Sequence, residues 1–248
     1  MVNKKVIVTT SWDDGNELDI RIAELLEKYN LKGTFYVPIH NKEHSVMNAV
    51  MLSEIATNFE IGGHTVNHLY LNTVGEAVAI YEISECKAIL EHQLGKTIDA
   101  FCYPGGKYSL RDINLVKQAG FLFGRTTRLM RTVPEVKSLL LDTSVQVYNH
   151  TNTELTAHCL KNTFLLPIVQ NCFFIKGNKN FSRLAETFMN RILTTGGVFH
   201  LWGHSWEIEE FGLWEEFELI LKAIAFNQKI SYLNNTECWK EFTTEKIT

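Results

Sequence analysis

Short runs of β-forming residues alternate with amphipathic helical patterns along the chain. The first pair is typical: residues 5–10 predict a strand, and residues 17–29 predict a helix whose apolar side chains Ile22, Leu25 and Leu26 share one face. Such alternation indicates a parallel sheet in which each strand is followed by a helix. It restricts the chain to the α/β class.

The same alternation continues towards the C-terminus. Further strands are expected at residues 34–37, 59–61, 100–103, 121–126, 139–141, 198–202 and 230–233. Further helices are expected at residues 47–57, 73–94, 111–119, 181–193 and 211–226, and Thr73 with Glu76 has the spacing of a capping box. The least regular region, residues 153–179, predicts a helix from 154 to about 164, a break near Pro167 and an apolar run at 172–175.

The number of strand–helix units suits one barrel. Seven or eight units in 248 residues match the usual size of a (β/α) barrel, and no linker or internal repeat divides the chain. We therefore expect a single domain over residues 1–248. A doubly wound open sheet is the alternative, but no glycine-rich phosphate loop follows any predicted strand.

The composition allows a large core and argues against nucleic acid as a partner. Hydrophobic residues make up 45% of the chain and the net charge is −4, which provides no positive field for phosphates. The N-terminal apolar run is too short for a signal peptide or a transmembrane segment, so we expect a soluble, cytoplasmic protein. Five cysteines without a C-x-x-C pair fit reduced thiols: Cys86, Cys102, Cys159, Cys172 and Cys238.

Two pairs of polar residues point to a metal site. Asp13 and Asp14 stand between the first predicted strand and Gly15, and adjacent carboxylates repel each other unless a cation or a shared proton is near. His64 and His68 have the i, i+4 spacing that places two imidazoles on one side of a helical turn. A carboxylate with two imidazoles is a common set for zinc or another transition metal. Taken singly, the first pair also suits an Asx turn or helix N-cap, and the second two packed histidines.

Other polar groups also follow predicted strands. The turn at residues 103–105 and His204 each come after a strand, where α/β folds build their sites. His200 shares a strand face with Trp202 and could be a hydrogen-bonded core residue, whereas Glu207 is close enough to orient the His204 ring. The remaining histidines have no partner at ligand spacing and are assigned to surface or core: His40, His44, His92, His150 and His158.

In their order along the chain, these motifs resemble those of the NodB-homology polysaccharide deacetylases, carbohydrate esterase family 4. The family motif T-F-D-D-G is similar to S-W-D-D-G at residues 11–15, and H-[ST]-x-x-H is met in full at residues 64–68. The motif R-x-P-x-G resembles C-Y-P-G-G at residues 102–106, and L-x-H is loosely similar to L-W-G-H at residues 201–204. The resemblance extends over nearly the whole chain.

The resemblance implies a metal-dependent amide hydrolase that acts on N-acetyl groups of sugars, on a distorted (β/α)7 barrel. By position, Asp14, His64 and His68 would bind a divalent metal, with zinc expected before cobalt, nickel, iron or manganese. Asp13 would be the general base and His204 the general acid. These roles make chemical sense, because a carboxylate can take a proton from a metal-bound water and an imidazole can protonate the departing amine.

Substrate contacts are expected from the turn after the strand at 100–103 and from aromatic rings. Backbone N–H groups of the turn containing Tyr103, Pro104 and Gly105 could stabilise a tetrahedral oxyanion. Trp202 is a candidate for sugar stacking. Three other aromatic side chains could either stack on a sugar or pack in the core: Trp12, Trp206 and Trp214.

Two motifs depart from the family pattern. Cys102 stands where the family has an arginine that tethers the catalytic carboxylate, and a thiol supplies neither its charge nor its fork of donors. Arg125 or Arg128, after the next predicted strand, could orient Asp13 instead. The fourth family motif has no secure match, and Asp142 is the candidate for its aspartate.

The motifs lead to one hypothesis and two alternatives. The hypothesis is a carbohydrate de-N-acetylase whose substrate is an N-acetylated sugar, a sugar-nucleotide or a short glycan. Hydrolysis of a small non-sugar amide or cyclic ureide is the alternative on the same barrel. A non-catalytic carbohydrate-binding homologue is the other, although such a protein has no need of Asp13. The sequence determines neither the metal nor the oligomeric state.

Overall fold

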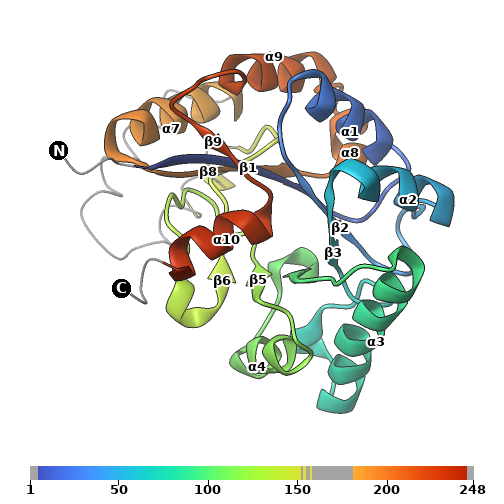
Figure 1. Ribbon diagram of the computed structural model, residues 1–248. Helices are drawn as coiled ribbons and strands as arrows, with labels where there is room; N and C mark the ends of the chain where they lie inside the picture. The colour runs from blue at the N-terminus through green and yellow to red at the C-terminus, as the bar shows by residue number, and fades with distance from the viewer. Residues whose placement is uncertain (1–4, 152, 155–156, 158–180, 245–248) are drawn as a thin grey trace.

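The computed structural model describes residues 5–151, 153–154, 157 and 181–244. Parallel strands form one curved sheet in the order β6-β5-β4-β3-β2-β1-β8-β7, and β9 pairs with β1 as well (Figure 1). The strands are β1 (Val6–Trp12), β2 (Thr34–Val37), β3 (Glu60–Gly63), β4 (Ala100–Cys102), β5 (Phe123–Arg125), β6 (Leu140–Leu141), β7 (Val145–Gln146), β8 (Gly197–Gly203) and β9 (Ser231–Tyr232).

Strand β1 is the centre of this sheet. All seven of its residues are buried, and it pairs with β8 along its whole length, from Val6 opposite Gly197 to Trp12 opposite Gly203. Its other edge is divided between β9, which pairs with Ile7 and Val8, and β2, which pairs with its last two residues. An apolar strand with partners on both edges is typical of the interior of a parallel sheet.

The sheet curves into a barrel that is not closed by strand pairing. Strands β6 and β7 end the order, and residues 142–144 connect them directly. This connection is held by backbone bonds instead: Ser144 N donates to the His200 carbonyl at 2.9 Å and Thr143 N to the Arg128 carbonyl at 3.0 Å. The predicted distorted α/β barrel is confirmed.

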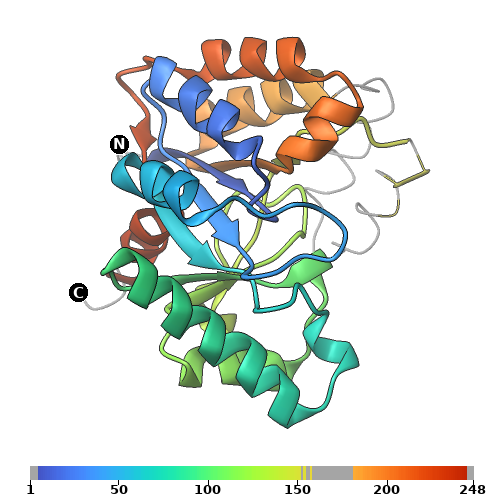
Figure 2. The same cartoon turned by 90° about the vertical axis from the view of Figure 1, so that its right-hand side faces the viewer.

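Helices cover the outside of the barrel and one of its ends (Figures 1 and 2). The α-helices are α1 (Asp19–Lys28), α2 (Ala49–Asn58), α3 (Glu76–Leu94), α4 (Leu110–Gln118), α7 (Phe181–Thr195), α8 (Ser205–Glu210), α9 (Trp214–Ile224) and α10 (Asn235–Thr244). Short 3-10 helices are η1 (Leu71–Thr73), η2 (Pro104–Gly106) and η3 (Val136–Ser138). No helix among the described residues is long and apolar enough to cross a membrane.

Helix α10 packs across one end of the barrel. Asn235 at its start accepts from the Tyr36 hydroxyl at 2.8 Å and donates to Thr9 Oγ1 at 2.8 Å, so it binds two strands at once. Trp239 stacks on Phe123 inside the barrel with ring centroids 5.1 Å apart, within the range of about 4.5–7 Å that is usual for aromatic pairs. This helix therefore closes the end of the barrel opposite to the ends of the strands where the candidate site lies.

The structure differs from some of the expectations about the elements. Thr73 is not the cap of α3, because it lies in η1 and its hydroxyl donates to the Tyr70 carbonyl, while Gly75 is the N-cap. The helix expected at residues 211–226 is α9 and begins later, at Trp214. The short helix α8 before it was not expected, and Gly212 between the two has a left-handed backbone (φ +64°). Strand β7 and helix α10 were not expected. The expectations for residues 153–179 lie almost wholly outside the described residues.

Candidate functional site

Polar side chains from neighbouring strands meet at the carboxyl end of the sheet. Asp13 and Asp14 follow β1, His64 follows β3, Arg125 ends β5 and His204 follows β8. Because the strands are parallel, their carboxyl ends lie along one rim of the barrel. At the turn after β1, Asp14 and Gly15 both have positive φ (75° and 59°), and a Cβ on Gly15 would lie 2.8 Å from Val37 Cγ1. Only glycine fits there.

Asp14, His64 and His68 form a compact set, the ligand triad. Asp14 Oδ1 lies 3.0 Å from His68 Nε2 and 3.5 Å from His64 Nε2, and potential ligand atoms of all three lie within 4.8 Å of one another. His64 Nδ1 donates to the Cys102 carbonyl at 2.9 Å. A carbonyl can only accept, so in the neutral ring the lone pair of His64 Nε2 faces the carboxylate.

The donor atoms of the ligand triad fit a divalent metal. Asp14 Oδ1 is buried and has no hydrogen-bond partner among the residues that the structure describes. An anionic oxygen facing an imidazole lone pair is unfavourable unless a cation lies between them. Two ligands of a tetrahedral zinc ion lie about 3.3 Å apart, close to both nitrogen–oxygen distances here.

The segment that carries the two histidines is a loop, so the expected helical turn is wrong. Residues 64–68 have no helical assignment, and Thr65 and His68 have left-handed backbones, with φ of 67° and 53°. Glu82 of α3 holds the loop: its carboxylate accepts from Asn67 N at 2.8 Å and from Asn67 Nδ2 at 2.6 Å. The imidazoles therefore converge because the loop folds back, not because of helical spacing.

Asp13 is paired with a guanidinium from the neighbouring strand. Arg125 Nη2 donates to Asp13 Oδ1, and both side chains are almost wholly buried. The Arg125 guanidinium also lies 5.2 Å from the Tyr36 ring and 4.7 Å from the Trp202 ring. Of the two arginines considered from the sequence, Arg125 is the one that reaches Asp13. The thiol of Cys102 lies 3.6 Å from the other carboxylate oxygen, Oδ2.

His204 faces the ligand triad and is oriented by Glu207. Its Nδ1 lies 2.7 Å from Glu207 Oε2, and its Nε2 lies 3.9 Å from Asp14 Oδ2. Gln146 of β7 donates to the same Glu207 oxygen at 3.1 Å. Burial lowers the pKa of His204, but the Glu207 hydrogen bond and the nearby carboxylates outweigh it and raise this pKa to about 9.

His200 lies in the core, as the strand pattern allowed. It is fully buried, its Nε2 lies 2.8 Å from Ser11 Oγ, and its Nδ1 donates to the Asp142 carbonyl at 3.0 Å. Burial and the positive charge of Arg125 lower the pKa of His200 to about 3. This ring is therefore neutral and has both nitrogens engaged in structural hydrogen bonds.

The Asp142 side chain binds Thr126 and Arg128. Its carboxylate accepts from Arg128 Nε at 2.7 Å and from the Thr126 hydroxyl at 2.6 Å. The acidic partner of the His204 ring is Glu207, from the short helix α8 that begins directly after His204. The assignment of Asp142 to the fourth motif stays a prediction.

The residues expected to contact substrate lie deeper than the sequence suggested. The Tyr103 ring is fully buried against Gly124, where an added Cβ would lie 2.3 Å from it, and Trp202 is 4% exposed. Tyr103 N donates to the Arg125 carbonyl at 3.3 Å, so this amide is not available to an oxyanion. Within the turn, Pro104 is buried and has no N–H, whereas Gly105 is exposed.

The other aromatic candidates separate into core and site. Trp12 and Trp214 both pack on Phe217, in the core. Trp206 is partly exposed, stacks on His44 with ring centroids 4.0 Å apart, and donates from Nε1 to Asp14 Oδ2 at 2.9 Å. The sequence did not single out His44, because its partner is far along the chain. Three described cysteines, Cys86, Cys102 and Cys238, are free and buried.

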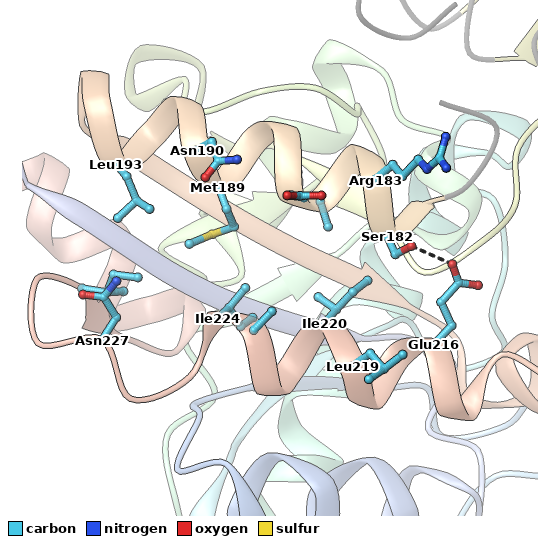
Figure 3. Close-up of a pocket in the computed structure, with 14 residues that line it drawn as sticks. Ser182, Arg183, Met189, Asn190, Leu193, Glu216, Leu219, Ile220, Ile224 and Asn227 are labelled. Atoms are coloured by element: carbon cyan, nitrogen blue, oxygen red, sulfur yellow. Dashed lines mark hydrogen bonds between the residues drawn. The ribbon is translucent and has the colours of Figure 1, made fainter. Parts of the chain in front are cut away.

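A groove elsewhere on the molecule does not include the site. It lies between α7 and α9, has a volume of about 430 Å³, and is lined mainly by apolar side chains such as Met189 and Ile220 (Figure 3). Ser182 and Glu216 hydrogen-bond at one end of it. None of the residues around the ligand triad lines this groove, so it is not the cleft in which the chemistry would occur.

Comparisons with known proteins agree with the motifs. Residues 2–124 match the family model described as polysaccharide deacetylase. A Bacillus subtilis (strain 168) protein named "Putative polysaccharide deacetylase YxkH" is 26% identical over 129 residues, which are 50% of this chain and 45% of that protein. The chain thus spans about half the length of this curated relative.

Solved structures share the fold. A "putative polysaccharide deacetylase from Mycobacterium smegmatis" is 16% identical and has a TM-score of 0.72 over 99% of this chain and 93% of its own. The chitin deacetylase from Colletotrichum lindemuthianum is 15% identical, with a TM-score of 0.59 over 96% and 92%. These likenesses show the fold, a NodB-type barrel. The match to the family model covers a segment that contains both Asp13-Asp14 and the histidine loop, and by this match the chain belongs to the polysaccharide deacetylase family.

Proposed function

We propose that this protein is a metal-dependent de-N-acetylase that hydrolyses the amide of an N-acetylated sugar, a sugar-nucleotide or a short glycan. The observation that carries the proposal is the placement of two proton-transfer groups beside a metal-binding set: Asp13 and His204 both lie against the ligand triad. The family and the barrel support the reaction class. We also propose that residues 1–248 form one catalytic domain, since the first and last described strands pair within one sheet.

The ligand triad would hold the metal, through Asp14, His64 and His68. A bound divalent ion, zinc first among the candidates, would polarise the amide carbonyl and lower the pKa of a water molecule. His64 is ready for this role without rearrangement, because its Nδ1 bond to the Cys102 carbonyl directs Nε2 towards the site.

Asp13 is the proposed general base. Its Oδ1 is occupied by Arg125, which keeps the carboxylate in place. Oδ2, which lies 3.6 Å from the weak donor Cys102 Sγ, is the oxygen that would take a proton from water. Since the ligand triad is complete without Asp13, a protein that only bound sugar would have no use for a buried carboxylate here. This argues against the non-catalytic alternative.

His204 is the proposed general acid. Glu207 holds its Nδ1, so Nε2 points towards Asp14 and the reacting group. The Glu207 hydrogen bond raises the pKa of His204 against the effect of burial, which favours the protonated imidazole that would donate to the departing amine. Gln146 steadies Glu207 from β7.

Metal content and acetate release test the proposal together. Purified protein should contain nearly one divalent metal per chain, and Asp14→Ala and His64→Ala should lose it. Asp13→Asn should keep the metal but release acetate from N-acetylated sugars about 10²–10⁴-fold more slowly. Glu85→Gln, on the exposed face of α3, is the control and should change neither quantity.

The outcomes separate the alternatives. If the protein binds metal and hydrolyses a cyclic amide but releases no acetate from any N-acetylated sugar, then the substrate is a small amide and not a carbohydrate. A protein without metal after loading with zinc, cobalt or manganese would overturn the proposal.

A further inference from the structure

The two oxygens of the Asp14 carboxylate have different surroundings. Oδ1 faces the imidazoles of His64 and His68 and has no hydrogen-bond partner among the described residues. Oδ2 accepts a hydrogen bond from Trp206 Nε1 at 2.9 Å. The carboxylate therefore faces the two imidazoles of the ligand triad through Oδ1, whereas Oδ2 is held by the Trp206 indole and lies 3.9 Å from His204 Nε2.

Trp206 is itself held by contacts on several sides. It is the second residue of α8, which is anchored by the Ser205 hydroxyl donating to buried Asp19 at 2.5 Å and by Ile208 in the core. Its ring stacks on His44, nearly parallel at 18°. An indole with this many neighbours has little freedom to turn its N–H away from Asp14.

The segment that carries His44 is also attached to the turn after β1. Met47 N donates to the Gly15 carbonyl at 2.8 Å, and Asn16 Nδ2 to the Ser45 carbonyl at 3.3 Å. His44, the indole and Asp14 thus form one connected unit in which each member limits the movement of the next.

From this geometry we infer that Trp206 is a positioning residue that fixes Asp14 as a one-oxygen metal ligand. The inference rests on the proposed function, because it assumes that the ligand triad binds a metal. Indole N–H donates and never accepts, so Trp206 can engage Oδ2 only as a donor. Its bond to a carboxylate is charge-assisted and directional. Outer partners of this kind commonly change metal affinity about 10–100-fold when removed.

The indole also limits what Trp206 can do for a substrate. His44 covers one face and the His204 ring lies 5.2 Å away, tilted at 32°. Of the aromatic residues considered for sugar stacking, Trp206 is the one that reaches the ligand triad, and its neighbours assign it to Asp14 instead of to the sugar.

Substituting Trp206→Phe tests the inference, because it removes the N–H and keeps an aromatic ring for the stack. We expect the zinc affinity of the variant, measured by competition with a chromophoric chelator, to fall about 10–100-fold. The visible spectrum of the cobalt-loaded protein should change, since the second carboxylate oxygen becomes free to approach the ion. The matched control is Trp214→Phe. It also loses an indole N–H hydrogen bond, in this case the 2.6 Å bond to the carboxylate of Glu209, which is not part of the ligand triad. The zinc affinity and the cobalt spectrum of this control should equal those of the wild type.

The possible results distinguish a failure of the inference about Trp206 from a failure of the proposed function. Unchanged zinc affinity and cobalt spectrum in Trp206→Phe, with metal bound by the wild type, would overturn the inference and leave the proposed function intact. A wild type that binds no metal would overturn both. Should Trp206→Phe fail to fold, His44→Ala is the second variant: it removes the stack but keeps the N–H, and we expect a smaller loss of affinity in the same direction. No loss there would also overturn the inference.

Discussion

At the scale of single residues, Arg125 of β5 binds Asp13, whereas the position at the end of β4 where the family motif has an arginine is occupied by Cys102. Cys102 occupies the motif position at the end of β4, and its partner in the sheet register is Arg125 of β5. Paired residues of neighbouring parallel strands point to the same face. The guanidinium can therefore reach Asp13 from one strand further along the sheet, which is why a motif with a lost arginine can still have a tethered carboxylate.

The ion pair between Arg125 and Asp13 should matter greatly for stability. Both partners are buried, so Arg125→Met leaves an uncompensated carboxylate in the barrel. We expect a loss of about 3–5 kcal/mol in the free energy of unfolding, measured by chemical denaturation. The double variant Arg125→Met/Asp13→Asn should recover much of it, because no buried charge remains.

A surface ion pair provides the comparison for this measurement. Lys28→Met breaks an exposed pair with Glu218 and should change the unfolding free energy far less. If the double variant were as unstable as Arg125→Met alone, the loss would come from packing around the guanidinium and not from the charge of Asp13.

At the scale of elements, strand periodicity located the site but not the shape of its loops. The strands were predicted to within a few residues because alternation and apolar runs are local signals. The conformation of residues 64–68 was predicted wrongly because it depends on a residue of α3. Thr65 and His68 tolerate left-handed backbones since their neighbours in the loop have fixed partners: Val66 N donates to the Glu82 carbonyl and Asn67 to its carboxylate.

Glu82 should therefore control both loop stability and metal binding. Glu82→Ala leaves the amide and side chain of Asn67 without their acceptors, and we expect a cost of about 1–3 kcal/mol in the free energy of unfolding. Zinc affinity should fall as well, because His68 follows Asn67 directly. Glu85→Ala, one turn along on the exposed face of α3, should alter neither. Equal zinc affinity in both variants would show that the loop at residues 64–68 keeps its conformation without the hydrogen bonds from Asn67 to Glu82.

At the scale of the whole molecule, the sequence indicated the barrel but not how it closes. The alternation of strands and helices was sufficient for the fold class, and the family motifs for the residues that gather at the carboxyl ends of the strands. The connection at residues 142–144 and the end cover α10 were missed, since both depend on partners far away in sequence, such as His200 for Ser144 and Tyr36 for Asn235. Short strands of two residues, such as β7, have too few residues to show a pattern.

His200 links these distant parts and should make the stability of the whole barrel depend on pH. Its ring bonds Ser11 of β1 and the Asp142 carbonyl, so it joins β1, β8 and the connection between β6 and β7. The pKa of His200 is about 3 in the folded protein and about 6.5 in an unfolded chain. Since the folded value is lower, the contribution of the neutral ring is complete above about pH 6.5 and is lost progressively as the pH falls towards 3.

The measurement compares the wild type with His200→Gln by chemical denaturation at several pH values. At neutral pH the variant should be less stable, because it loses buried hydrogen bonds worth about 1–3 kcal/mol. On acidification only the wild type loses stability through residue 200, because its unfolded chain binds a proton there that the folded protein does not. This loss is at most about 1.4 kcal/mol per pH unit, so the difference in unfolding free energy between the two proteins should shrink between about pH 6.5 and 4.5. His92→Gln, at an exposed position of α3, should follow the wild-type profile. A difference that stays constant with pH would mean that His200 is not held neutral by the barrel.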